Sequence, residues 1–216
     1  MLFLSNEQLQ ALSHDSTVLE QDGLGPKVLR LSDGSFLKLF RKRRMLSSET
    51  LKPYAQRFAD NAKRLQRLGF ATPEIVEVYR LEDPINRTAV RYRPLPGETL
   101  RHALEQSGPS QQQPLVKQFG QLLGLLHEKG VYFRSIHLGN VLLLPSSELG
   151  LIDLADMKIG RRPLSLRLRL RNLKHMRRYD KDRSWLFEQF NYALAEGYAQ
   201  HAGHYAKAVL ANDQSA

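Results

Sequence analysis

Three polar residues stand beside short apolar runs in this sequence. Lys38 lies inside Phe-Leu-Lys-Leu-Phe, Asn140 precedes Val-Leu-Leu, and Asp153 follows Leu-Ile. Phosphoryl transfer uses residues of these types, because it requires a cation on the phosphates, Mg²⁺ bridging phosphate oxygens and an oriented hydroxyl nucleophile. Each residue also has an ordinary structural alternative: Lys38 can face solvent from an alternating strand, Asn140 can be a turn residue and Asp153 can cap a turn.

The first 93 residues, which carry Lys38, are predicted to form a β-rich unit with one long helix. Strands are expected around residues 18–19, 27–31, 36–40, 75–79 and 88–92, with Asp33-Gly34 marking a hairpin and residues 83–86 a turn. A helix capped by Ser47 or Ser48 is expected to continue to Gly69. Before the sheet, Ser5 and Gln8 indicate a capping box that opens a short amphipathic helix.

Residues 94–216, which carry Asn140 and Asp153, are predicted to be mainly helical. The pattern indicates a short helix from Thr99, a polar break at 107–114, a helix over 115–129, and a later helix capped by Ser184. Two β-like runs, 141–144 and 149–152, precede Asp153. The alternation of Leu and Arg over 164–171 fits either a half-buried strand or an amphipathic helix. The expected fold class is therefore α+β, with a small antiparallel β lobe and a mainly helical C-terminal lobe.

Two sequence blocks resemble the protein-kinase superfamily, most closely its bacterial small-molecule and lipopolysaccharide core (heptose/Kdo) kinase branches. Residues 133–142, Phe-Arg-Ser-Ile-His-Leu-Gly-Asn-Val-Leu, resemble the aminoglycoside-phosphotransferase catalytic loop His-Gly-Asp-Leu-His-Pro-Gly-Asn. Residues 151–155 stand where the family has Asp-Phe-Gly, and residues 95–100 resemble the segment after the adenine hinge. The resemblance implies a two-lobed protein-kinase-like fold, with residues 1–93 covering the nucleotide and residues 94–216 carrying the catalytic loop.

The resemblance also implies roles for individual residues. Asn140 and Asp153 would hold Mg²⁺, and Lys38 would pair with the α- and β-phosphates of ATP. Gly23 and Gly25 would let the backbone cover the phosphates. The family's helix glutamate, which pairs with the strand lysine, has no clear counterpart: Asp60 and Asn61 fall near the expected place, and Glu49 lies close to the helix start.

Ser135 stands where the family has its catalytic aspartate, five residues before Asn140. Loss of a general base commonly costs about 10²–10⁴-fold in rate, yet phosphoryl transfer depends mostly on positioning and electrostatics. An ATP-dependent phosphotransferase acting on a sugar hydroxyl is the first expectation, and a pseudokinase that binds without catalysis is the alternative. His137 and Asp156 are the candidate substitutes for the base, although His137 is better explained as a hydrogen-bonded organiser of the loop.

The positive charge of the chain is concentrated in residues 158–183. This basic segment holds eleven Lys or Arg against Asp180 and Asp182, or +9 of a formal net charge of +10. Such density predicts an anion-facing surface, and the candidate contacts to an anionic substrate are Arg134, Arg169, Arg171, Arg177 and Arg178. The resemblance implies a lipopolysaccharide core sugar or another sugar acceptor, with an anionic membrane surface as a further partner. Nucleic acid is a third possibility, disfavoured because the segment lacks interleaved aromatic residues.

Composition excludes several classes of chemistry. The chain has no cysteine, which rules out disulfides, thiolate zinc sites and cysteine nucleophiles. Metal binding through His137 is not expected, because no other histidine stands at ligand spacing. The sequence predicts no export signal and no transmembrane helix. The expected localisation is therefore cytoplasmic, with peripheral association with the inner membrane as an option.

Overall fold

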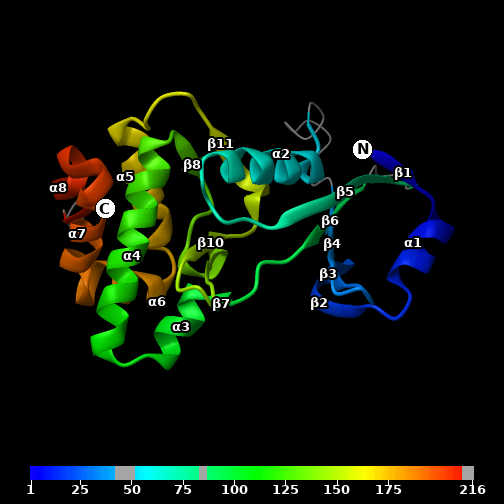
Figure 1. The fold of residues 1–216 in the computed structure, drawn as a ribbon, viewed down its shortest axis with the longest axis horizontal. Helices are drawn as coiled ribbons and strands as arrows, with labels where there is room; N and C mark the ends of the chain where they lie inside the picture. The colour runs from blue at the N-terminus through cyan, green and yellow to red at the C-terminus, as the bar shows by residue number, and fades with distance from the viewer. Residues whose placement is uncertain (42–51, 83–86, 211–216) are drawn as a thin grey trace. The chain divides into compact units, whose positions relative to one another are not determined.

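The computed structural model describes residues 1–41, 52–82 and 87–210. The chain forms two compact units: unit 1 comprises Met1–Leu95 with Asp153–Asp156, and unit 2 comprises Pro96–Ile152 with Met157–Ala216. Helices and strands together give a mixed α and β fold, compatible with the predicted α+β class. Figure 1 shows the elements with the labels used below.

Unit 1 is built on a six-stranded sheet with the order β1-β5-β6-β4-β3-β2. Its strands are β1 (Leu2–Leu4), β2 (Thr17–Asp22), β3 (Gly25–Arg30), β4 (Phe36–Phe40), β5 (Glu74–Leu81) and β6 (Thr88–Arg93). The five predicted strands pair antiparallel, as expected, and the sheet gains a sixth strand, β1, which was not predicted and runs parallel to β5. A three-residue strand is too short to show a period of two, so hydrophobic alternation does not reveal β1.

The two faces of this sheet are covered differently. On one face, Leu29, Leu37 and Ala89 form a buried cluster that Leu9 and Leu12 of α1 (Asn6–Ser13) partly cover. The capping box predicted at Ser5 and Gln8 is present. Helix α2 (Tyr54–Arg67), which lies beside β5 in Figure 1, contributes another buried apolar face. Because successive strand residues alternate in direction, Lys38 points to the face opposite Leu37.

The predicted start of the long helix falls partly outside the described residues. Ser47, Ser48 and Glu49 lie there, as do the turn residues 83–86. The predicted start is too early, because α2 begins at Tyr54 with Pro53 as its N-cap residue. The helix ends before Gly69, which has a φ of 87°. Glycine suits this position because a left-handed residue commonly ends a helix.

Unit 2 consists mainly of helices. They are α3 (Leu100–Gln106), α4 (Pro109–Glu128), α5 (Leu166–Met176), α6 (Asp180–Arg183), α7 (Asn191–Ala202) and α8 (Ala206–Leu210). Short strands form two small sheets: β7 (Glu98–Thr99) with β9 (Val141–Leu143) and β10 (Leu149–Leu151), and β8 (Val131–Phe133) with β11 (Met157–Ile159). The strands β8 and β11 were not predicted, because each has only three residues.

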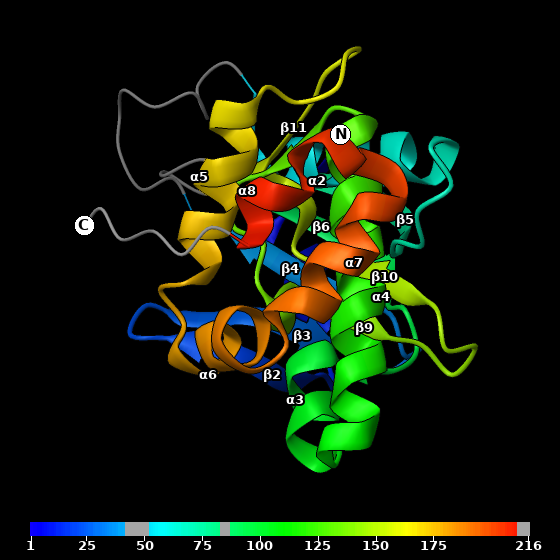
Figure 2. The ribbon, with the colours of Figure 1, turned by 90° about the vertical axis from the view of Figure 1, so that its left-hand side faces the viewer.

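Helices α4 and α7 lie side by side, as Figure 2 shows. Two glycines permit this approach. A Cβ atom on Gly120 would clash with the carbonyl oxygen of Leu194, and one on Gly197 would clash with that of Lys117. The two helix backbones therefore approach each other closely at these glycines.

Three helix predictions in unit 2 need correction or completion. Helix α4 begins at Pro109 and not at residue 115, because Gly108 serves as its N-cap and proline is favoured in the first turn. Ser184 does not cap a long helix; it follows α6 and begins a π-helical turn that ends at Gln189, before α7. The Leu/Arg alternation forms helix α5 from Leu166 onward.

Candidate functional site

Lys38 forms an ion pair with Asp153 inside unit 1. Strand β4 is an interior strand, where Lys38 pairs with Val28 on β3 and Val90 on β6. The Lys38 Nζ lies 2.7 Å from Asp153 Oδ1. The lysine side chain is 17% exposed and the aspartate 45%, so solvent reaches the carboxylate. Lys38 is thus held by a carboxylate 115 residues away along the chain.

The backbone of Asp153 has a left-handed conformation, with φ at 56°. Non-glycine residues rarely adopt this conformation, because it costs about 1–3 kcal/mol. Residues with such backbone strain cluster at functional sites. The following turn, η2 (Leu154–Asp156), is fixed by helix α2: the buried Asn61 donates from Nδ2 to the Leu154 carbonyl at 2.7 Å. The helix residue therefore holds the chain next to Asp153.

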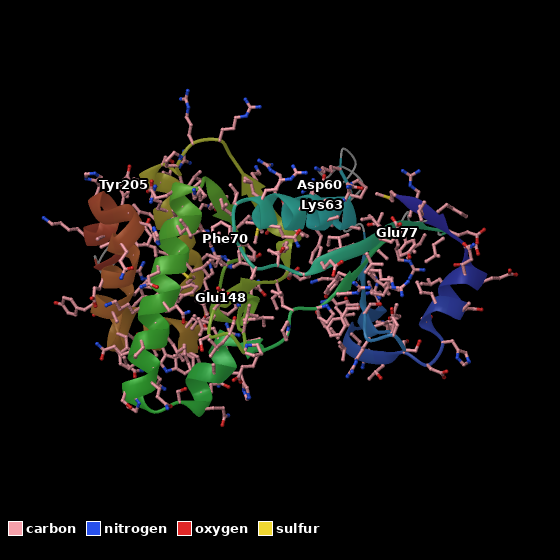
Figure 3. All side chains as sticks on the ribbon, viewed as in Figure 1. Asp60, Lys63, Phe70, Glu77, Glu148 and Tyr205 are labelled. Carbon is pink, nitrogen blue, oxygen red and sulfur yellow. The ribbon has the colours of Figure 1, made fainter. Side chains whose placement is uncertain are left out.

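The expected helix partners of Lys38 have other roles. Asp60, labelled on α2 in Figure 3, pairs with Lys52 at 2.5 Å and accepts from Gln56 at 2.8 Å. Asn61 contacts Leu154 as described above, and Glu49 lies outside the described residues. The lysine's carboxylate partner in this structure is Asp153.

Gly23 and Gly25 lie at the tip of the β2–β3 hairpin, where Asp22 pairs with Gly25. Gly25 has a φ of 109°, which requires glycine. The Asp22 carboxylate accepts from the Leu24 amide at 2.9 Å and contacts the Arg41 guanidinium. The pKa of the Asp22 carboxyl is lowered mainly by the hydrogen bond from the Leu24 amide and next by that from the Arg41 guanidinium. The tip is therefore closed by its own hydrogen bonds and by Arg41, which also donates to the Leu24 carbonyl at 2.9 Å.

Ser135 and Asn140 belong to unit 2, where one loop brings them together. Asn140 is buried and donates from Nδ2 to the Ser135 carbonyl at 3.0 Å. The Ile152 amide donates to the Asn140 carbonyl at 3.1 Å. Positions 135 and 140 are thus tied across the loop, and Asn140 also holds the end of the β9–β10 hairpin.

His137 organises this loop, as expected. Its Nδ1 accepts from the Gly139 amide at 3.0 Å, and its ring lies 4.5 Å from that of Tyr179. The other candidate substitute for the base, Asp156, lies in η2 of unit 1. His137 is thus engaged in holding the loop.

Arg101 and Asp182 anchor the loop, and sequence reasoning missed both. The Asp182 side chain is fully buried; its Oδ2 accepts from the Leu138 amide at 2.8 Å and its Oδ1 from Arg101 Nε at 2.8 Å. The guanidinium also lies 5.2 Å from the Tyr179 ring centroid. The only sequence signal was an acidic residue within a strongly basic segment.

The candidate anion-binding arginines divide into two groups. Arg134, Arg171 and Arg178 are exposed, and Arg177 lies over the Phe187 ring at 4.1 Å. Arg169 is different, because its side chain is 2% exposed and pairs with Glu128 at 2.7 Å. The expectation that Arg169 faces an anionic substrate does not hold, since its guanidinium is occupied inside unit 2.

Arg169 opens a buried chain of hydrogen bonds. Arg169 donates to the Tyr198 hydroxyl at 2.8 Å, which lies 2.8 Å from His127 Nδ1. His127 Nε2 lies 3.1 Å from Asn172 Oδ1, and Asn172 donates from Nδ2 to the Phe133 carbonyl at 2.8 Å. Burial lowers the pKa of His127 to about 3, so the imidazole is neutral at pH 7. A neutral ring protonated on Nε2 satisfies every group in this chain.

The residues expected to hold a nucleotide are suited to it chemically. Mg²⁺ is commonly bound by one or two protein oxygens together with substrate phosphates, and Asp153 offers a solvent-reachable carboxylate. Lys38 supplies the cation. Within residues 1–41, 52–82 and 87–210, no group of three or more His, Asp or Glu is placed to hold a metal ion. In the same residues, no helix is long and apolar enough to cross a membrane.

Comparison with known proteins adds no family assignment. Neither the protein-family models nor the curated proteins gave a match to this chain.

Proposed function

We propose that this protein is an ATP-dependent phosphotransferase that transfers phosphate to a sugar hydroxyl. The observation that carries the proposal is the Lys38–Asp153 ion pair, formed at 2.7 Å with Asp153 in a left-handed backbone conformation. A lysine on a central strand joined to a strained, half-exposed aspartate is an arrangement that serves phosphate and metal together.

In this proposal each residue has a defined task. Lys38 would bind the α- and β-phosphates, and Asp153 would supply a carboxylate oxygen to Mg²⁺. The role of Asn140 as a metal ligand rests on the sequence resemblance. The metal, when bound, neutralises charge on the phosphates. Because the phosphates offer Lys38 a new partner, nucleotide binding exchanges the Lys38–Asp153 pair for contacts to ligand and metal.

The acceptor and the localisation rest on sequence resemblance. The resemblance to lipopolysaccharide core kinases favours a phosphate-bearing core sugar, and exposed arginines such as Arg178 suit an anionic acceptor. A cytoplasmic location, with peripheral association with the inner membrane as an option, is part of the proposal. A basic nucleic-acid-binding protein ranks last, and its affinity would fall steeply with salt and survive loss of Asp153.

Thermal unfolding with and without Mg-ATP tests the nucleotide site. At about 100 times its dissociation constant a ligand stabilises by about 2.7 kcal/mol, which for a chain of this size raises Tm by roughly 5–11 °C. We expect this Mg-dependent shift in the native protein and its loss in Asp153→Asn, because asparagine tolerates the left-handed conformation but lacks the charge.

Asp15→Asn is the matched control for that experiment. Asp15 also has a φ of 56° and is exposed in unit 1. Its replacement should leave the Mg-ATP shift unchanged. An equal Tm shift in the native protein and in Asp153→Asn would show that the Asp153 charge does not contribute to Mg-ATP binding.

A nucleotide-binding module without catalysis is the second candidate function, favoured by Ser135. Between Phe133 and Asn140 the loop carries no carboxylate, and in the described residues the Ser135 hydroxyl makes no hydrogen bond. Mg-ATP binding with no phosphate transfer to core oligosaccharide or other sugars would establish this candidate and reject the first.

Ser135→Asp measures what the missing base costs. We expect it to raise the rate of phosphate transfer, by up to about 10²–10⁴-fold, because a general base commonly contributes that much. The measurement is ADP formation with a sugar acceptor, and Ser146→Asp, on the exposed β9–β10 turn of the same unit, is the control. A lower rate in Ser135→Asp would show instead that the serine belongs to a different mechanism.

A further inference from the structure

Unit 2 contains a cavity of about 700 Å³ that none of Lys38, Ser135, Asn140 and Asp153 lines. Its walls come from β8, β11, the connection over residues 160–165 and the first two turns of α5. This volume is within the roughly 300–1,000 Å³ typical of small-molecule sites. The cavity is therefore a candidate site separate from the proposed nucleotide site.

The connection that forms one wall is firmly held. Gly160 donates from its amide to the Gly130 carbonyl, and Leu164 donates to the His127 carbonyl, each at 2.9 Å. The buried Arg169 donates from Nε to the Leu164 carbonyl at 2.8 Å. These bonds fix the connection against the end of α4 and the start of α5, so the cavity is formed before any ligand arrives.

Among the residues that the structure describes, four cationic residues line the cavity and no acidic residue does. They are Lys158, Arg161, Arg162 and Arg171. All four are exposed, and within the described parts of the chain their side chains form no hydrogen bond or ion pair. Four unpaired positive charges around one hollow repel one another and attract an anion.

The start of helix α5 adds to this preference. Ser165, the N-cap residue, lines the cavity, and its side chain makes no capping hydrogen bond. The first turn of this 11-residue helix contains no acidic residue. The positive end of the helix dipole thus lies at the same hollow as the four cations, an arrangement that favours phosphate.

The cavity also has an apolar side. Tyr132, Pro163, Leu164 and Leu168 line it together with the cations. Tyr132 and Leu164 are buried, so they form a fixed apolar wall. A bare inorganic anion would leave this wall without a partner. A phosphate carried on an apolar group would satisfy both sides.

We propose that this cavity binds a phosphomonoester attached to an apolar body, such as a lipid phosphate headgroup. The phosphate contacts the four cationic residues Lys158, Arg161, Arg162 and Arg171. The attached apolar group lies along Tyr132 and Leu168. The inference does not rest on the proposed function, since the nucleotide residues do not line the cavity. Binding is therefore expected to survive Asp153→Asn.

The test is calorimetric titration of the full chain with dihexanoyl phosphatidic acid, a soluble phosphomonoester lipid. The pocket variant is Arg161→Gln/Arg171→Gln. Its matched control is Arg167→Gln/Lys174→Gln, which removes the same charge from exposed positions on α5 that do not line the cavity. Because charged hydrogen bonds contribute about 1.5–3 kcal/mol each, we expect at least about tenfold weaker binding in the pocket variant and about twofold or less in the control.

Comparison ligands distinguish the sources of the phosphate. Glycerol 3-phosphate carries the same phosphomonoester without acyl chains, and dihexanoyl phosphatidylcholine carries the chains without a monoester. Stronger binding of phosphatidic acid than of either comparison ligand supports the proposal with a lipid source. Equal binding of glycerol 3-phosphate would show that the apolar wall does not contribute and would overturn the proposal. Equal losses in pocket variant and control, or tighter binding of single-stranded RNA that both variants weaken equally, would overturn the proposal.

Discussion

Arg169→Ala is expected to lower the free energy of unfolding by about 3–5 kcal/mol, the range for breaking a buried ion pair by removing one partner. The side chain is 2% exposed and pairs with Glu128. Its removal also leaves the Tyr198 hydroxyl and the Leu164 carbonyl without their donor. Urea unfolding measures the change as a lower midpoint at an unchanged m-value.

Arg167→Ala is the control, because Arg167 belongs to the same helix and is exposed. Both variants lose one positive charge, so their difference reports burial and hydrogen bonding. Arg167→Ala should change stability by no more than about 0.5 kcal/mol, as surface substitutions commonly do. Equal effects of the two variants would contradict the structural role given to Arg169.

Helix α5 shows why the sequence could not separate Arg169 from its neighbours. Its buried positions are Arg169, Asn172, Leu173 and Met176, which recur at three or four residues. Leu166 and Leu170 are each 42% exposed. Prediction from hydrophobic periodicity assumes that leucine is buried and arginine is exposed. Here the helix buries Arg169, because Glu128 of α4 and Tyr198 of α7 bind its guanidinium.

The elements of unit 1 were easier to predict, because local signals determine them. The bounds of β4 follow from alternation in Phe-Leu-Lys-Leu-Phe after an Asp-Gly turn, and the capping box at Ser5 specifies the start of α1. The Lys38–Asp153 pair follows from no local signal, because it joins a strand to a turn far along the chain. Sequence analysis identified both residues as candidates but could not predict that they form an ion pair with each other.

The loop around Asn140 depends on one buried carboxylate, and Asp182→Ala is expected to lower the free energy of unfolding by about 3–5 kcal/mol. The substitution leaves Arg101 without its carboxylate and the Leu138 amide without an acceptor. Asp180→Ala is the control, since the Asp180 side chain is 86% exposed and pairs with Arg183 on its own helix. Urea unfolding of both variants gives the comparison.

Asp182→Asn separates the loop anchor from general stability. Asparagine keeps the volume and can still accept from the Leu138 amide, but it loses the charge that holds Arg101. Hydrogen exchange at Leu138 should therefore accelerate strongly in Asp182→Ala and only modestly in Asp182→Asn, while both variants lose the Arg101 pair. If exchange at Leu138 were unchanged in Asp182→Ala, the buried carboxylate would not hold the loop, and hydrogen bonds within the loop, such as that from Asn140 to Ser135, would hold it instead.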